Sequence, residues 1–344
     1  MIRKFLKAPA FWYADTAEEK VFPWEKILSP LGRLYGWAVL QRFDLHYPIP
    51  MARPVICVGN LVAGGAGKTP VAMALVDMLQ AQGHNPHLLS RGFGGTEAGP
   101  LQVSPDRDTA ADVGDEALLL VTKAPTWVSR QRALGAQAAI DTGASVIVMD
   151  DGFQNPSIYK DFSIVVIDGG VGFGNGHILP AGPLREPLAF GLSRAHAVVI
   201  VGEDKTNAED IVRSHTTAPI FHARLSSDAG NPDLFGKEVF AFAGIGRPEK
   251  FKETLIAAGA VVEGWGSFSD HCAYLEEDLG ELVAAADAKK AIIVTTAKDH
   301  VRLPPGLKDR VQVFGVHITW DAPADTFELP ELIRQTLAQN GYVA

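Results

Sequence analysis

The sequence predicts an α/β protein in which parallel sheets are covered by helices on both faces. Short β-branched runs such as PVICVGN (54–60) and FSIVVIDGG (162–170) alternate with helical patterns over residues 70–82 and 249–258. Strands that are apolar throughout are typical of a parallel sheet that is buried on both sides. A chain of 344 residues is long enough for two such units, since domains commonly hold about 100–200 residues.

The polar, turn-rich stretch LSSDAGNPDLFGK divides the chain. We expect a core domain over residues 51–224, a linker over 225–237 and a smaller C-terminal α/β domain over 238–344. The predicted strands are PVICVGN (54–60), HLLS (87–90), SVIVMDDG (145–152), FSIVVIDGG (162–170), AHAVVIVG (195–202), VFAFAGIG (239–246), AIIVTTAKD (291–299) and VQVFGVHI (311–318).

Composition excludes several classes of protein. With 47% apolar and 21% charged residues, the chain is predicted to fold rather than to be disordered. A net charge of −9 argues against nucleic acid as a partner. The two distant cysteines, Cys57 and Cys272, provide neither a disulfide framework nor a Cys-x-x-Cys metal site, and this suits a reducing compartment. No apolar run long enough for a transmembrane helix and no signal peptide is evident, so we expect a cytosolic protein.

Residues 1–50 are predicted to form an N-terminal amphipathic helical segment. They contain Trp12, Trp24 and Trp37, and from Ile27 onward apolar residues recur at helical spacing with basic residues between them. Two interpretations are open. The segment lies on an anionic membrane surface with its apolar face down, or it is a helix that packs on its own domain.

The segment LVAGGAGKTP (61–70) has the form of a phosphate-binding loop. It follows a strand and precedes a helix, so that glycine N–H groups and a helix N-terminus can surround phosphate groups. Lys68 is expected to reach the β- and γ-phosphates and Thr69 to contact Mg²⁺. Val62 stands where the general pattern has a glycine. The residues that we expect to bind the phosphates of ATP are Gly64, Gly65, Ala66, Gly67, Lys68, Thr69 and Pro70.

Two acids at the end of a strand are expected to complete a Mg²⁺ site. SVIVMDDGFQN ends in Asp150 and Asp151, and ligands of open parallel sheets lie beyond the carboxyl ends of the strands. Which of the two contacts the metal is open. The guanine-binding pattern [NT]-K-x-D is not evident, because Lys298 and Asp299 of TTAKDH are adjacent, so ATP is favoured over GTP. The sequence therefore predicts a P-loop NTPase-like α/β/α sandwich.

Further stretches contain reactive groups that a fold would not require. They are LSRGFGG (89–95), VGDEALLL (113–120), GFGNGHILPAGPLREP (172–187) and SFSDHCAY (267–274). Each has a plain structural explanation: Asp115 as a helix cap, Arg185 in a solvated loop, and His271 as a surface histidine. Their occurrence together on one chain with a phosphate loop favours a catalytic site.

In the order and spacing of these motifs, the chain resembles the tetraacyldisaccharide 4′-kinases, the lipid A 4′-kinases of Gram-negative bacteria. The resemblance covers nearly the whole chain, from APAFWY (8–13) to TTAKDHVRL (295–303). In this family the phosphate loop begins with a small or β-branched residue, which explains Val62. The resemblance implies two α/β/α domains, joined by a two-stranded linker, with the site in the cleft between them.

The resemblance also implies a reaction and its partners. ATP and Mg²⁺ would be used to phosphorylate the 4′-hydroxyl of a tetraacyl disaccharide 1-phosphate lipid at the cytoplasmic face of the inner membrane, with no obligate protein partner indicated. It favours surface binding by residues 1–50, because a lipid with four acyl chains cannot readily leave the bilayer.

The family motifs assign roles to individual residues. Lys68 and the Asp115–His271 pair are expected to be catalytic, with Asp115 as the base, because a carboxylate near a sugar hydroxyl can accept its proton. The residues expected near the metal are Thr69, Glu116, Asp150 and Asp151. Those expected to bind substrate are Arg91, Gln154, Asn175, Arg185 and Glu186.

Three positions depart from the family pattern, namely Asn155, Cys272 and Ala297. None removes a residue named above, although the surroundings of the site can differ. A regulatory ATPase of the partition or metal-chaperone kind is the alternative, because its loop also reads GG-x-GKT. Such proteins generally have a lysine at the position of Ala63, and its absence here favours a small-molecule kinase.

Overall fold

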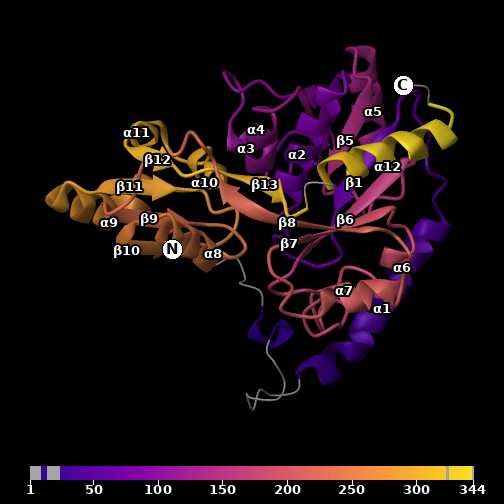
Figure 1. Ribbon diagram of the computed structural model, residues 1–344, viewed down its shortest axis with the longest axis horizontal. Coiled ribbons are helices and arrows are strands. Elements are labelled where there is room, and N and C mark those ends of the chain that lie inside the picture. The colour runs from indigo at the N-terminus through magenta and orange to yellow at the C-terminus, as the bar shows by residue number, and fades with distance from the viewer. Residues whose placement is uncertain (1–8, 14–23, 323–324, 343–344) are drawn as a thin grey trace.

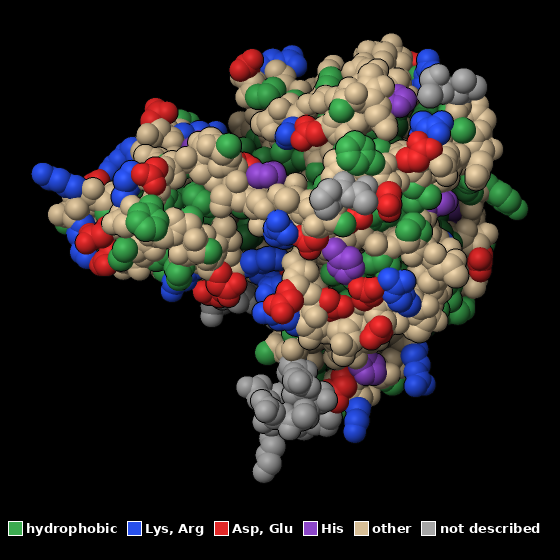
Figure 2. Space-filling view, in the orientation of Figure 1, with side chains coloured by type: hydrophobic (Ala, Val, Ile, Leu, Met, Phe, Trp, Pro, Cys, Tyr) green, Lys and Arg blue, Asp and Glu red, His purple; other side chains and the backbone are tan. Residues whose placement is uncertain are grey.

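The structure is a computed structural model, and it describes residues 9–13, 24–322 and 325–342. The chain forms two lobes of unequal size (Figure 1). In the space-filling view the smaller lobe projects from the larger one, and the surface is indented where they meet (Figure 2). Each lobe is built on its own sheet.

The larger lobe contains a sheet of nine strands among the described residues. Its strands are parallel except for β3 and β13 at the two edges, which run antiparallel to their neighbours. In spatial order they are β13 (Val316–Trp320), β8 (Ile220–Ser227), β7 (Ala197–Val201), β6 (Phe162–Asp168), β1 (Val55–Gly59), β5 (Val146–Asp150), β2 (Pro86–Ser90), β4 (Thr126–Val128) and β3 (Leu101–Gln102).

Helices cover both faces of this sheet. Alternate residues of β1 explain the arrangement: Ile56 and Val58 enter one apolar cluster with α2 (Lys68–Ala81) and α12 (Asp325–Gln339), while Val55 and Cys57 enter another. The second cluster includes residues of α5 (Arg132–Asp141), α6 (Leu188–Leu192) and α7 (Ala208–Arg213). The predicted α/β/α sandwich is therefore confirmed.

The smaller lobe repeats this arrangement with fewer strands. Its sheet is wholly parallel, in the order β10 (Val261–Ser267), β9 (Glu238–Ala243), β11 (Ile292–Thr295) and β12 (Val311–Val313). Helix α8 (Pro248–Ala257) packs on one face and α9 (Glu276–Lys289) on the other, because successive residues of β9 point to opposite faces. The remaining short helices of the two lobes are η1 (Ala10–Trp12), α3 (Ala110–Val113), α4 (Asp115–Leu120), α10 (Ala297–His300) and α11 (Pro305–Lys308).

The two lobes are connected by an antiparallel ribbon. The first half of β8 pairs with β7 in the large sheet, and its second half, Ala223 to Ser227, pairs with Trp320 to Val316 of β13. The expected linker, residues 225–237, thus begins inside a strand. The chain enters the smaller lobe along β8 and leaves it along β13.

The end of the chain differs from the expected boundaries, which assign all of residues 238–344 to the smaller domain. The predicted strand VQVFGVHI is in fact two strands, β12 and β13, which belong to different sheets. Helix α12 then lies across the larger lobe (Figure 1), where Leu329, Ile333 and Leu337 are buried in the same cluster as α2. Apolar periodicity predicts a strand here but does not indicate which sheet it joins.

Helix α1 (Trp24–Asp44) runs along the larger lobe (Figure 1). Gly32 and Gly36 are its buried residues, and a Cβ at either would lie 2.8 Å from an atom of Ile178, so the helix packs closely on the 178–187 segment. On another side of the helix, large apolar side chains are exposed: Trp24, Ile27, Leu31, Leu34, Tyr35 and Trp37. The helix therefore packs on its own domain and still presents an apolar stripe. No helix among the described residues is long and apolar enough to cross a membrane.

The placement of α12 on the larger lobe can be tested with Ile333→Ala. Ile333 is 1% exposed, so the change should lower the free energy of unfolding by about 2–5 kcal/mol. Hydrogen exchange should accelerate in β1 and β6 of the large sheet. The matched control Ile256→Ala, at a side chain that is 54% exposed, should change stability by less than about 1 kcal/mol. Acceleration confined to β9–β12 would contradict this placement.

Candidate active site

The phosphate loop joins β1 to α2, so that Lys68 is the first residue of the helix. Gly67, which precedes the helix, has a φ of +84°, a conformation that residues with a Cβ rarely adopt. The helix N-terminus directs free N–H groups at the loop and favours an anion there. Lys68 itself is buried. The local backbone thus has the form that phosphate binding requires.

Val62 has a structural reason to replace the first glycine of the general pattern. Its side chain is buried in the apolar cluster beneath the loop, and its backbone forms an antiparallel bridge with Leu184. The next residue, Ala63, donates its N–H to the Pro183 carbonyl at 2.7 Å. The loop therefore begins as an extended segment paired with the 178–187 segment, a conformation that suits a β-branched residue.

The aromatic turn η1 lies against this loop. The Tyr13 hydroxyl donates to the Ala63 carbonyl at 3.2 Å, and the Asn175 side-chain amide donates to the Phe11 carbonyl at 3.2 Å. The backbone N–H of Asn175 also donates to the Trp12 carbonyl at 2.8 Å. Asn175, expected to bind substrate, thus uses its side chain to hold the N-terminal turn beside the phosphate loop.

Asp150, at the end of β5, faces the phosphate loop. The Thr69 hydroxyl donates to Asp150 Oδ2 at 2.9 Å. The other oxygen, Oδ1, is buried and has no hydrogen-bond partner among the described residues. Burial and then the charge of Glu116 raise the pKa of Asp150 to about 7. A buried carboxylate oxygen without a partner is costly unless a cation or donor reaches it.

This donor set fits a magnesium ion. The described residues contain no group of three or more His, Cys, Asp and Glu side chains that could hold a metal by themselves. Mg²⁺ usually binds through one or two carboxylates together with substrate phosphates. The site offers such carboxylates. Thr69 is hydrogen bonded to Asp150, and Glu116 is close enough to raise the pKa of Asp150.

Asp151 has different partners from Asp150. Its φ of +51° turns it out of the strand, and its Oδ1 lies 2.8 Å from Arg185 Nη1 and 3.8 Å from Lys68 Nζ. Although burial acts in the opposite direction, Lys68 and Arg185 lower the pKa of Asp151. This carboxylate therefore stays ionised and fixes two cations beside the phosphate loop.

Glu186, next to Arg185, is fully buried rather than open to a substrate. It forms an ion pair with Arg194, and Gln154 Nε2 donates to Glu186 Oε1 at 2.9 Å. Gln154 Oε1 in turn accepts from Arg185 Nη1 at 3.4 Å. Glu186 thus positions Gln154, and Gln154 positions Arg185. Of these three side chains, Arg185 is the one that contacts Asp151.

Asp115 and His271 come from different lobes and meet at the cleft. Asp115 is the first residue of α4 and is 3% exposed. His271 Nδ1 lies 3.0 Å from each carboxylate oxygen of Asp115. Although burial opposes the effect, the hydrogen bond with His271 and the charges of Lys298 and Arg302 lower the pKa of Asp115. An ionised carboxylate only accepts hydrogen bonds, so His271 Nδ1 carries the proton between them.

Lys298, which the sequence analysis used only to exclude a guanine site, lies in the same cluster. It comes from α10 of the smaller lobe, and its Nζ is 3.2 Å from both Glu116 Oε1 and Asp270 Oδ1. The same Nζ is 3.5 Å from His271 Nε2. Although burial opposes the effect, these carboxylates and Asp115 raise the pKa of Lys298. The ion pair by which Lys298 joins Glu116 to the smaller lobe could be found only with the fold in hand.

Arg302 of the smaller lobe forms an ion pair with Asp115. Its side chain is 4% exposed, and Nε lies 3.4 Å from Asp115 Oδ2. The guanidinium also forms an ion pair with Asp299, which is fully buried and accepts a 2.7 Å hydrogen bond from the Tyr274 hydroxyl. Arg302 Nη2 donates to the Gly244 carbonyl at 2.8 Å. The core of the smaller lobe thus fixes the cation that faces the carboxylate of the larger lobe.

A second set of contacts closes the cleft near the phosphate loop. Asp168, at the end of β6, lies 2.9 Å from Arg247 Nη1 and 3.5 Å from Lys250 Nζ of the smaller lobe. A Cβ added at Gly246 would lie 3.0 Å from the backbone nitrogen of Gly65. The loop before α8 therefore reaches the phosphate loop, in which Gly64 and Gly65 stay exposed.

The three departures from the family pattern lie at the margins of this site. Asn155 Oδ1 accepts hydrogen bonds from the N–H and hydroxyl of Ser157 and so stabilises a turn. Cys272 contributes its backbone carbonyl to Arg302, while Ala297 is the first residue of α10. Arg91, expected to bind substrate, is exposed in the loop after β2.

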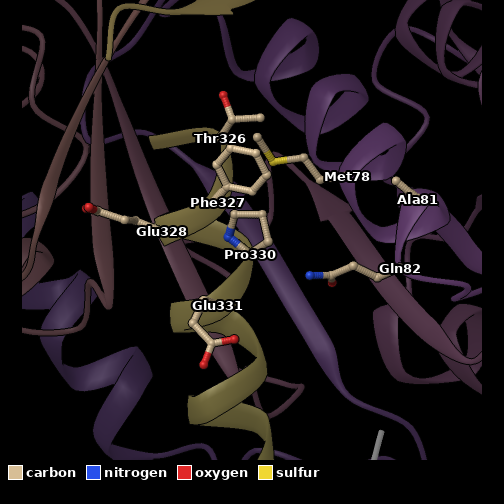
Figure 3. A pocket seen from close by; sticks show the side chains of 8 residues that line it. All are labelled: Met78, Ala81, Gln82, Thr326, Phe327, Glu328, Pro330 and Glu331. Carbon is tan, nitrogen blue, oxygen red and sulfur yellow. The ribbon is translucent and has the colours of Figure 1, made fainter. Parts of the chain in front are cut away.

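A cavity of about 660 Å³ lies away from these residues, between the end of α2 and the start of α12 (Figure 3). Met78 and Phe327 face each other across it, with Gln82 and Glu331 nearby (Figure 3). Lys68 is at the other end of α2, and the described lining includes no cationic side chain that could hold a phosphate. This cavity therefore does not belong to the candidate active site.

Comparison with known proteins agrees with the geometry. A family model described as tetraacyldisaccharide-1-P 4′-kinase matches residues 24–337. The tetraacyldisaccharide 4′-kinase of Paramagnetospirillum magneticum is 51% identical over 319 residues, which are 93% of this chain and 96% of the relative. That of Rhodospirillum centenum is 49% identical over 324 residues, 94% of this chain and 95% of the relative.

A solved structure shows the same fold. The crystal structure of LpxK from Aquifex aeolicus in complex with ATP has a TM-score of 0.73 and 26% sequence identity. The match covers 91% of this chain and 99% of that chain.

Proposed function

Because the chain belongs to the tetraacyldisaccharide-1-P 4′-kinase family, we propose that it transfers the γ-phosphate of ATP to the 4′-hydroxyl of a tetraacylated glucosamine disaccharide 1-phosphate. It is a lipid A 4′-kinase and thus a phosphotransferase. The observation that best supports this function is the Asp115–His271 pair, which joins the two lobes at the cleft.

Phosphoryl transfer depends mainly on positioning and on neutralising charge. The phosphate loop and Lys68 hold the phosphate groups of the nucleotide at the start of α2. Asp151 keeps Lys68 and Arg185 in place as two nearby positive charges.

Asp115 is the general base for the sugar hydroxyl. It is ionised, and its hydrogen bond with His271 and the nearby Arg302 fix its orientation. A carboxylate held in this way can accept the hydroxyl proton as the bond to phosphorus forms. His271 orients the base, as the third group of a catalytic triad does.

Thr69, Asp150 and Glu116 would hold Mg²⁺, which supplies neutralisation of phosphate charge when it is bound. Asp150 is the stronger candidate for direct contact, because its Oδ1 has no partner among the described residues, whereas Asp151 is already paired with Arg185. Arg185 and Arg91 remain the candidates for contact with the substrate. Gln154, Glu186 and Asn175 hold the segment that carries Arg185.

The direct test is incubation with γ-labelled ATP, Mg²⁺ and the tetraacyl disaccharide 1-phosphate in detergent micelles. We expect label in the lipid, and kcat of Asp115→Asn reduced by about 10²–10⁴, the usual scale for loss of a general base. Asn keeps the shape of the side chain, and binding of ATP should be unchanged. Hydrolysis of ATP without label in the lipid would favour the regulatory ATPase instead, and a kcat within a few-fold of wild type would contradict the role of Asp115.

We also propose that the protein works at the cytoplasmic face of the inner membrane, with α1 on the membrane surface. The exposed apolar stripe of α1, which includes Ile27, Leu31 and Leu34, supports this proposal, and Lys26 and Arg33 lie on the same helix. Such a helix binds a bilayer through its apolar area and through attraction to anionic lipids. Since α1 packs on the 178–187 segment beside the phosphate loop, it would hold the cleft close to the lipid.

The double change Leu31→Gln and Leu34→Gln should reduce binding to liposomes on the order of tenfold, because two exposed leucines are lost from the membrane contact. Both side chains are more than half exposed, so circular dichroism should be unchanged. Leu134→Gln, at a leucine of α5 that is 49% exposed, is the control and should bind as wild type does. Equal cosedimentation of all three proteins would contradict membrane binding by this stripe.

A further inference from the structure

A second cavity, of about 360 Å³, lies at the amino-terminal ends of the strands of the large sheet, and the active site lies at their carboxyl ends. Ser163 and His196, which line it, lie at the amino ends of β6 and β7. Asp168, in contrast, ends β6 beside the phosphate loop, so the strand separates it from Ser163 by about 17 Å at about 3.3 Å per residue. The cavity is therefore not part of the phosphoryl-transfer site.

Basic side chains gather in this cavity. His46, Lys160, Arg194 and His196 line it, and no carboxylate is among the lining residues. Arg194 forms an ion pair with Glu186, a fully buried carboxylate that does not line the cavity. The cavity thus has an excess of positive charge.

Lys160 lacks an anionic partner among the described residues. Its Nζ donates to the Asn155 carbonyl, a neutral acceptor, and it takes part in none of the ion pairs found in the described part of the chain. Burial is the main cause that lowers the pKa of Lys160. A partly buried ammonium without a counter-ion is destabilising, and a bound anion would relieve that cost.

The two histidines present hydrogen-bonding groups to the same space. His196 Nδ1 accepts the N–H of Ser163 at 3.0 Å, so the ring proton of the neutral form lies on Nε2, which can donate to an anion. His46 Nδ1 donates to the Arg42 carbonyl at 2.7 Å, so Nε2 can donate to an anion once the imidazole is protonated, a form that a bound anion favours. Arg194 adds charge but few free donors, since its guanidinium is stacked against Phe43 at 4.3 Å and bonded to Glu186.

The position of the cavity indicates the kind of anion. Phe43 and His46 are at the carboxyl end of α1, and Leu45, Tyr47 and Ile49 beside them are exposed apolar residues. The helix is 21 residues long, about 30 Å at 1.5 Å per residue. An anion bound here would lie next to apolar surface, at the end of the helix that we place on the membrane, as the phosphate of a lipid headgroup does.

We propose that this cavity binds the phosphate of an anionic phospholipid headgroup, held by Lys160, His46 and His196. The inference rests on the proposed membrane association of α1. It adds a second membrane contact at the carboxyl end of the helix, beyond the exposed apolar stripe that includes Leu31 and Leu34. Two such contacts hold the helix flat on the bilayer and direct the cleft toward the membrane.

The test compares wild type with Lys160→Met on vesicles of phosphatidylcholine alone and of phosphatidylcholine mixed with phosphatidylglycerol. On the mixed vesicles we expect Lys160→Met to bind about tenfold more weakly, more than the roughly fivefold that a single surface lysine contributes. On neutral vesicles the two proteins should bind equally. Lys160→Arg should bind the mixed vesicles as wild type does, which also checks that the cavity folds.

The control is Lys123→Met, which removes the same charge from a lysine paired with Asp77 on α2, on the other face of the sheet. It should change binding to the mixed vesicles by less than about twofold. Equal losses for Lys123→Met and Lys160→Met would mean that only overall charge matters, and this would overturn the proposal.

Two further outcomes are distinguishable. If wild type binds neither kind of vesicle, the proposed membrane association fails and this inference fails with it. If wild type and Lys160→Met bind mixed vesicles equally, membrane association stands and the headgroup site is wrong. Histidine NMR signals of His46 and His196 should respond to dihexanoyl phosphatidylglycerol at lower concentration than to glycerol phosphate. An equal response to both would identify a site for free phosphate esters rather than for lipid.

Discussion

The hydrogen bond between Asp115 and His271 is the interaction on which the rest of the site depends. It joins the two lobes, and Asp115 of the larger lobe also lies 3.4 Å from Arg302 of the smaller lobe. A carboxylate buried at the start of α4 would be destabilised without nearby cations, and the smaller lobe supplies His271, Lys298 and Arg302. Asp115 is thus held ionised by groups of the other lobe. A phosphate loop by itself can bind nucleotide, but the proposed base has its partners only where the two lobes meet.

The fold allows the lobes to meet in this way while remaining separate bodies. The large sheet provides the rigid half of the site, since the phosphate loop and Asp150 both follow adjacent parallel strands at their carboxyl ends. The smaller lobe is inserted between β8 and β13, which form one antiparallel ribbon. Because α12 then packs on the larger lobe, the smaller lobe is attached through that ribbon and through the polar contacts across the cleft. Asp168, with Arg247 and Lys250, adds a contact of this kind.

The features that the sequence predicted correctly are local ones. Apolar runs predicted the buried strands, and the order strand, glycine loop, helix predicted the turn from β1 into α2, because both depend on neighbouring residues. Long-range relations were missed. VQVFGVHI reads as one strand but contributes to two sheets, and the closeness of Lys298 to Glu116 spans 182 positions. The substrate roles expected for Glu186 and Asn175 came from a resemblance in motifs. In the structure both side chains form hydrogen bonds within the protein, and a motif does not show such partners.

The central claim is that Asp115 and His271 act as one unit across the two lobes, and a double-mutant cycle on kcat for phosphate transfer to the lipid tests it most directly. The four proteins are wild type, Asp115→Asn, His271→Gln and the double variant, compared at saturating ATP and lipid. If the pair acts as a unit, the double variant should lose little more activity than Asp115→Asn alone, because residues that work together are strongly non-additive. If the two single losses multiply in the double variant, the residues act independently and the account is contradicted.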